Sequence, residues 1–129
     1  MINAQELLHE AREVAAGAYA PYSGIRVGAV AVAKDGTRYR GANVENAAYP
    51  STLCAEAVAI GHAVSSGARE LEAVAVACLD LEECYPCGQC RQRMAEFGVR
   101  TVIVQGPDGE ARIHTLEELL PHGFTISGD

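Results

Sequence analysis

Residues 54–56 read Cys-Ala-Glu and residues 86–90 read Pro-Cys-Gly-Gln-Cys, and each stretch stands where the hydrophobic pattern predicts the start of a helix. Cys54, Cys87 and Cys90 offer three sulfurs, and Glu56 offers one carboxylate. Three cysteine ligands leave the fourth position of a tetrahedral Zn²⁺ open, which is typical of a catalytic zinc. The two stretches therefore predict a zinc centre with an acid/base group beside it.

The surrounding pattern predicts helices and strands that alternate along the chain. We expect helices over 3–19, 54–66, 88–97 and 116–120, and strands over 27–33, 37–42, 71–79, 101–105 and 111–114. Asp35-Gly36 predicts a hairpin that pairs the first two strands antiparallel. Strand–helix–strand order predicts an α/β fold, with a partly parallel sheet and helices on its faces. Because no linker or repeat is visible, we expect one domain over residues 1–129.

The position of these helices suggests how the cysteines meet. If the strands before the helices at 54 and 88 are neighbours, both helix N-termini lie at one edge of the sheet. The positive helix ends then favour thiolates. Glu56 lies two residues after Cys54, so it does not share that helix face and would reach the open side of the metal. Zn²⁺ lowers the pKa of bound water from ~15.7 toward ~7, and a nearby carboxylate can relay the proton. This chemistry suits the addition of water to an electrophilic ring carbon that carries an amine.

Charge and composition narrow the classes of partner. The formal net charge of −7 argues against a nucleic-acid backbone and favours a small substrate. No apolar run reaches the ~20 residues that a membrane helix needs. The five cysteines are odd in number and clustered, and the N-terminus shows no basic signal segment, so metal binding or reduced thiols are favoured over disulfides. We expect a cytoplasmic protein.

Taken in order, the two stretches resemble those of the zinc-dependent cytidine deaminases. The resemblance extends along most of the chain, through Ala-Pro-Tyr-Ser at 20–23, Val-Gly-Ala at 27–29, Asn-Val-Glu-Asn-Ala at 43–47, Arg-Gln at 91–92 and Leu-Leu-Pro at 119–121. It implies a three-layer α/β/α fold around a central mixed five-stranded sheet. It also implies the small homotetrameric branch, which hydrolyses cytidine and 2′-deoxycytidine to uridine and 2′-deoxyuridine in pyrimidine salvage and releases ammonia.

The resemblance also implies a role for each matched position. Zn²⁺ would be held by Cys54, Cys87 and Cys90, with Glu56 as proton shuttle and with Arg91 and Gln92 next to the ligands. The nucleoside would be contacted by Asn43 and Glu45 at the ribose, by the Ala55 backbone at the base edge, and by Ile25, Tyr49 and Phe124. Phe124, which would cover the base, and residues near Tyr49 would come from a neighbouring subunit.

Two positions depart from the family pattern. Ala57 stands where the family commonly has an arginine that hydrogen-bonds the ligand sulfurs and reduces their negative charge. Arg91, Gln92 and the helix N-termini remain to balance this charge. Ile25 stands where the family often has phenylalanine, so the apolar volume is kept but the aromatic face is lost.

Other interpretations remain open. Cys84 and Cys87 have the same spacing as Cys87 and Cys90, so Cys84 is an alternative ligand. As a fourth sulfur it would make the zinc structural, in a binding module without catalysis. A deaminase of another cytosine nucleoside, such as a blasticidin S-type antibiotic, shares the zinc motifs and often lacks the arginine. Asn43 and Glu45 favour a free ribose instead. A redox Cys-x-x-Cys would leave Cys-Ala-Glu at 54–56 without a role.

Overall fold

The computed structural model describes residues 2–126, and these residues form four α-helices, one 3₁₀ turn and five strands. In chain order the elements are α1 (Ala4–Ala15), β1 (Val27–Ala33), β2 (Arg38–Ala42), η1 (Tyr49–Ser51), α2 (Ala55–Ser65), β3 (Leu71–Cys78), α3 (Gly88–Glu96), β4 (Thr101–Gln105), β5 (Ala111–Thr115) and α4 (Leu116–Leu119). Every predicted helix and strand is present. The first helix ends earlier than predicted, and η1 lies between the strand predicted over 37–42 and the helix predicted over 54–66.

The five strands form one mixed sheet in the order β2-β1-β3-β4-β5. β1 pairs antiparallel with both β2 and β3, β3 pairs parallel with β4, and β4 pairs antiparallel with β5. The strands that precede α2 and α3 are therefore not neighbours, because β1 lies between β2 and β3. Both run opposite to β1, however, so both end at the same edge of the sheet. The expected meeting of the two helix N-termini still follows.

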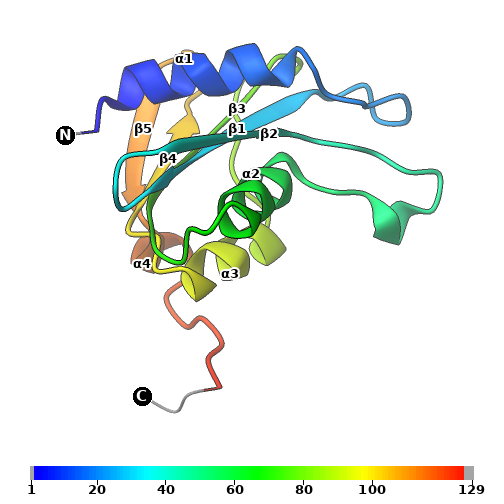
Figure 1. The fold of residues 1–129 in the computed structure, drawn as a ribbon. Helices are drawn as coiled ribbons and strands as arrows, with labels where there is room; N and C mark the ends of the chain where they lie inside the picture. Colours follow the sequence, from blue (N-terminus) through cyan, green and yellow to red (C-terminus); the bar gives the residue numbers. More distant parts are fainter. Residues whose placement is uncertain (1, 127–129) are drawn as a thin grey trace.

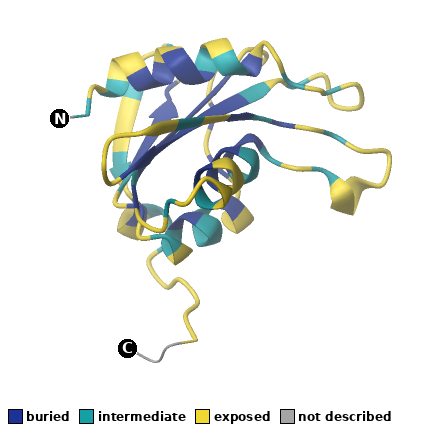
Figure 2. Ribbon diagram, viewed as in Figure 1, coloured by how far each residue is buried: buried dark blue, intermediate teal, exposed yellow. Residues whose placement is uncertain are grey.

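Helices cover both faces of the sheet, which confirms the three-layer α/β/α arrangement (Figure 1). α1 packs on one face, and α2, α3 and α4 lie on the other. Successive strand side chains point to opposite faces. On β1, Val30 and Val32 therefore pack with α1, whereas Ala29, Ala31 and Ala33 pack with the layer of three helices. The three inner strands β1, β3 and β4 have nearly continuous apolar sequences and are buried on both faces, whereas the edge strands β2 and β5 are mostly exposed (Figure 2).

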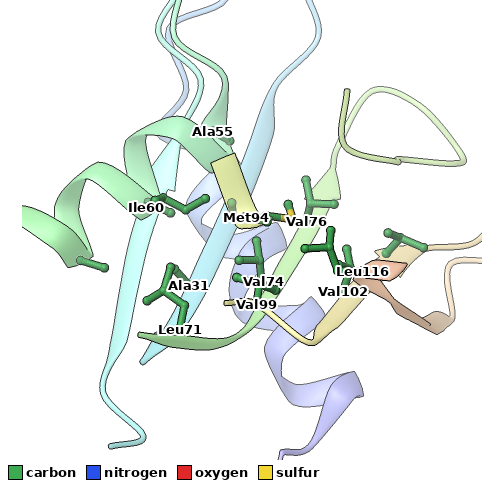
Figure 3. Close-up of a cluster of buried hydrophobic side chains, with 14 of the residues drawn as sticks. Ala31, Ala55, Ile60, Leu71, Val74, Val76, Met94, Val99, Val102 and Leu116 are labelled. Carbon is green, nitrogen blue, oxygen red and sulfur yellow. The ribbon is translucent and has the colours of Figure 1, made fainter. Parts of the chain in front are cut away.

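The larger core lies between the sheet and the helices that carry the cysteines. Figure 3 shows Ile60 of α2 and Met94 of α3 among side chains of β3 and β4, including Val74, Val76 and Val102. Met94 is completely buried. This packing fixes α2 and α3 against the sheet and so fixes the relative position of their first turns.

Two glycines let helices approach the sheet closely. A Cβ added to Gly41 of β2 would lie 2.3 Å from the backbone nitrogen of Ala59 and 2.7 Å from the carbonyl oxygen of Ala55. A Cβ added to Gly28 of β1 would lie 2.0 Å from the carbonyl oxygen of Ala11 in α1. Both contacts are with backbone, which cannot rotate away. Gly41 therefore sets the distance between β2 and the start of α2. Within residues 2–126, no helix has the length and apolar character that crossing a bilayer requires.

Candidate zinc site and substrate pocket

Three cysteines gather at the edge of the sheet where β2 and β3 end. Cys54 immediately precedes α2, Cys87 immediately precedes α3, and Cys90 lies in the first turn of α3. Their sulfur atoms all lie within 4.8 Å of one another. Zn–S bonds of about 2.3 Å in a tetrahedron place sulfurs about 3.8 Å apart, so the three donors fit Zn²⁺ with only small adjustment. Among the described residues, Cys84 is not part of this metal-binding group.

The charge environment of the three thiols explains why they need a cation. Burial, followed by the nearby Glu56 carboxylate, raises the pKa of Cys90. Burial and the neighbouring Cys87 also raise the pKa of Cys54. The pKa of Cys87 is lowered: burial opposes ionisation, but the backbone N–H of Cys90 and the two other thiols outweigh it. Three thiolates are therefore not stable together without a positive ion between them, and Zn²⁺ supplies that charge.

Glu56 lies in the first turn of α2 and is only 4% exposed. Burial raises the pKa of its carboxyl, and its own backbone N–H, the guanidinium of Arg93 and the Cys90 thiol oppose that rise only in part. A carboxyl with a raised pKa holds a proton more readily than an ordinary carboxyl does, which favours exchange of a proton with a bound molecule. The structure therefore places a buried carboxyl with a raised pKa beside the three sulfurs.

A pocket of about 270 Å³ opens beside Glu56. Its wall is mostly apolar and is formed by the start of β1, the end of β3, the segment between β2 and α2, the start of α2 and the loop over residues 79–87. The lining residues are Val27, Asn43, Thr52, Leu53, Cys54, Ala55, Glu56, Val76, Leu81, Glu83, Cys84, Tyr85 and Cys87. An apolar pocket with a few polar groups at one end suits a flat, polar ring.

Asn43 and Glu45 lie in two adjoining pockets. Asn43 lines the pocket of Glu56, where its Oδ1 accepts from the Val27 N–H at 2.8 Å and its Nδ2 donates to the Ile25 carbonyl at 2.9 Å.

Glu45 lines the second pocket, where it accepts from the backbone N–H groups of Tyr22 and Ser23. The Ser23 hydroxyl bond is the main cause that lowers the pKa of Glu45. Thr52 lines both pockets and joins them.

The remaining predicted contacts differ in how far they are buried and in which pocket they line. Ala55 lines the first pocket and is 1% exposed. Tyr49 belongs to η1, lines the second pocket and is 75% exposed. Ile25 is half-buried and packs against the larger core. Phe124 lies on the segment after α4, which leads away from the sheet, and is 69% exposed (Figure 1).

Arg91 and Gln92 lie on α3 beside the ligands, but their side chains bind backbone. Arg91 donates from Nε to the Pro86 carbonyl at 2.9 Å and from Nη1 to the Leu119 carbonyl at 2.9 Å. It therefore supports the loop that carries Cys87. Gln92 holds the backbone of Phe124.

Two residues near the site were not singled out from the sequence. Arg93 donates from Nη1 to the Cys90 sulfur at 3.4 Å. Its spacing of three from Cys90 on a predicted helix would have placed both on one face. Gln105, 4% exposed at the end of β4, donates to the carbonyls of Leu81 and Glu82 and so holds the loop that forms one pocket wall. No sequence pattern near Gln105 indicates that partnership, because it depends on a contact distant in the sequence.

Comparisons with known proteins agree on one group. Residues 1–105 match the family model described as the cytidine and deoxycytidylate deaminase zinc-binding region. A cytidine deaminase of Halalkalibacterium halodurans is 44% identical over 123 residues, which cover 94% of this chain and 93% of that protein. A cytidine deaminase of Sporosarcina psychrophila is 40% identical over 126 residues, which cover 96% of this chain and 93% of that protein. The crystal structure of cytidine deaminase from Burkholderia pseudomallei superposes with a TM-score of 0.87 at 37% identity, covering 95% of this chain and all of that one.

Proposed function

This chain belongs to the cytidine and deoxycytidylate deaminase family, and we therefore propose that it hydrolyses cytidine and 2′-deoxycytidine to uridine and 2′-deoxyuridine with release of ammonia. The observation that carries this proposal is the buried carboxylate of Glu56 beside three sulfurs that lie within 4.8 Å of one another. We assign Cys54, Cys87 and Cys90 as the zinc ligands. A reaction of this kind belongs to pyrimidine salvage.

When bound, Zn²⁺ supplies a Lewis acid that activates water near neutral pH. Glu56 would take a proton from that water and deliver it to the ring nitrogen next to the amino-bearing carbon, while the oxygen of the water bonds to that carbon. It then transfers the second proton of the water to the amino group, which departs as ammonia and leaves a carbonyl on the ring. The raised pKa of Glu56 supports both directions of transfer. The apolar wall of the pocket excludes competing water and strengthens these interactions.

The ribose would bind across the junction between the two pockets. The Asn43 amide uses one acceptor and one donor site on the backbone, so it keeps another of each for a hydroxyl. Glu45 is held as a carboxylate that can accept from the second hydroxyl. Ala55 lines the pocket, where its backbone would contact the base edge, and Ile25 packs against the larger core.

We also propose a homotetramer in which a neighbouring subunit completes the site. The support is a group of exposed large side chains around the two pockets, including Tyr22 at 51%, Tyr49 at 75% and Leu53 at 48% exposed. Apolar side chains that gather around a site in this way are typical of contacts between subunits. Phe124 would cover the base from such a neighbour. We further propose a single domain over 1–129 and a cytoplasmic location, where five reduced cysteines are expected.

The substrate is tested by ammonia release from a panel of cytosine compounds. We expect turnover of cytidine and 2′-deoxycytidine and none of blasticidin S, and the reverse pattern would favour the antibiotic deaminases.

The non-catalytic zinc module is tested with Cys84→Ala. Because Cys84 lies outside the sulfur group, we expect this variant to keep its zinc. Loss of zinc in it would support a structural site with four sulfurs.

A further inference from the structure

One positive side chain directly contacts the sulfur cluster. Arg93 of α3 lies three residues after Cys90, on the same face of the helix, and its Nη1 donates to the Cys90 sulfur at 3.4 Å. Cys90 is completely buried, whereas Arg93 is half-buried. The hydrogen bond therefore joins a sulfur that water does not reach to a guanidinium that stays permanently charged.

The charge balance of the site requires such a group. Three thiolates around one Zn²⁺ leave a net charge of −1, and a buried uncompensated charge is costly. Arg91 does not supply the compensation, because its guanidinium binds the carbonyls of Pro86 and Leu119. Position 57 on α2, three residues after Cys54, holds alanine. Within residues 2–126, Arg93 is the only arginine or lysine that hydrogen-bonds one of the three sulfurs.

Resting on the ligand set proposed above, we propose that Arg93 is the positioning residue that neutralises the Cys90 thiolate and stabilises the zinc-loaded site. Position 57 on α2 corresponds to position 93 on α3 in its spacing from a cysteine of the cluster. Ala57 has the same spacing of three from Cys54 that Arg93 has from Cys90, although Ala57 lies in the first turn of α2 and Arg93 in the last turn of α3. One guanidinium at either position would therefore serve the same cluster, so the charge can be moved from α3 to α2.

The test is zinc affinity, measured by competition with a chromophoric chelator at fixed pH. We expect Arg93→Ala to bind zinc about 10- to 100-fold more weakly than the wild type, the usual cost of losing a partner of a metal ligand. Arg93→Lys keeps the positive charge and should recover most of the loss. The double variant Arg93→Ala with Ala57→Arg should also recover affinity. Arg100→Ala, which removes one charge beside the opposite end of β3, is the matched control and should bind like the wild type.

The outcomes separate this inference from the proposed ligand set. Thermal unfolding of the zinc-free chains shows whether Arg93→Ala acts on the metal or on folding. Wild-type zinc affinity in Arg93→Ala overturns the inference and leaves the three-cysteine site standing. Equal weakening in Arg93→Ala and Arg93→Lys, with no recovery by Ala57→Arg, also overturns it, because the effect is then not one of charge. A wild-type chain that takes up no zinc, and is unaffected by Cys54→Ser, overturns the ligand set and this inference together.

Discussion

The side chain of Gln92 binds both backbone groups of Phe124. Its Oε1 accepts from the Phe124 N–H at 3.0 Å, and its Nε2 donates to the Phe124 carbonyl at 2.8 Å. Through this pair, α3 fixes the segment after α4 at a point 32 residues further along the chain. Gln92 therefore acts on the position of Phe124, although it neighbours the zinc ligands in sequence.

We predict that Gln92→Ala raises KM for cytidine about tenfold with a smaller change in kcat. The reason is that Phe124, proposed to cover the base in a neighbouring subunit, loses its anchor, and one aromatic contact contributes about 0.5–1.5 kcal/mol. Steady-state kinetics measures this, with zinc content as the control. Phe124→Ala should have the same effect. If Phe124→Ala raises KM and Gln92→Ala does not, the anchor is unnecessary.

Gly41 and Gly61 form a matched pair for testing how α2 is placed. Gly41→Ala should destabilise the protein by about 1–3 kcal/mol and lower activity, because its Cβ would push on the backbone of α2 just after Cys54. Gly61→Ala lies on α2 itself with nothing within 4 Å of the added Cβ. It should stabilise the protein by up to about 1 kcal/mol. Urea unfolding compares the two, and equal stability of both variants would show that β2 and α2 can move apart freely.

Gln105 should contribute to stability and to the shape of the pocket. Gln105→Leu leaves the carbonyls of Leu81 and Glu82 without these donors, at an expected cost of about 1–3 kcal/mol. Gln5→Leu is the control, since the Gln5 amide is exposed and makes one bond, to the Ala111 N–H. Urea midpoints measure the difference. A loss in Gln5→Leu as large as that in Gln105→Leu would argue against a special role for the buried amide.

Acid should weaken the contact between α1 and β2. Burial of Glu10 opposes its ionisation, but hydrogen bonds from Arg38 and Arg40, both at 2.8 Å, lower the pKa of its carboxyl below the ordinary value. A lowered pKa in the folded state adds stability that is complete above about pH 4.5 and is lost as pH falls through the lowered pKa. In zinc-free protein, the stability advantage of wild type over Glu10→Gln should therefore shrink between pH 6 and pH 3. An advantage that does not change with pH would contradict this assignment.

Local signals in the sequence were sufficient for most of the fold. Val27–Ala33 and Thr101–Gln105 have the bounds that were predicted, because short apolar runs between turn residues leave few alternatives. The pairing of strands was harder to predict. Strand order depends on distant contacts, and the insertion of β1 between β2 and β3 separates strands that we had considered as neighbours.

The candidate site likewise combines residues that local sequence patterns predict with residues whose partners lie far away in the sequence. The cysteines and Glu56 follow from spacing along two helix starts. The partners of Arg91, Gln92 and Gln105 depend on where distant backbone groups lie, and no residue pattern indicates these. Arg93 falls between these two cases. Its spacing of three from Cys90 can be seen in the sequence, but only the structure shows that its guanidinium contacts the Cys90 sulfur.

The most direct test compares cytidine hydrolysis by the wild type and Glu56→Gln, followed by ultraviolet absorbance, with zinc counted in both preparations. The three sulfurs do not depend on the carboxylate, so both proteins should hold one zinc per chain, while only the wild type releases ammonia at a measurable rate. Glutamine keeps the size of the side chain but cannot carry a proton between water and the base. Full activity in Glu56→Gln, or a wild type that contains zinc and leaves every cytosine nucleoside unchanged, would contradict the account.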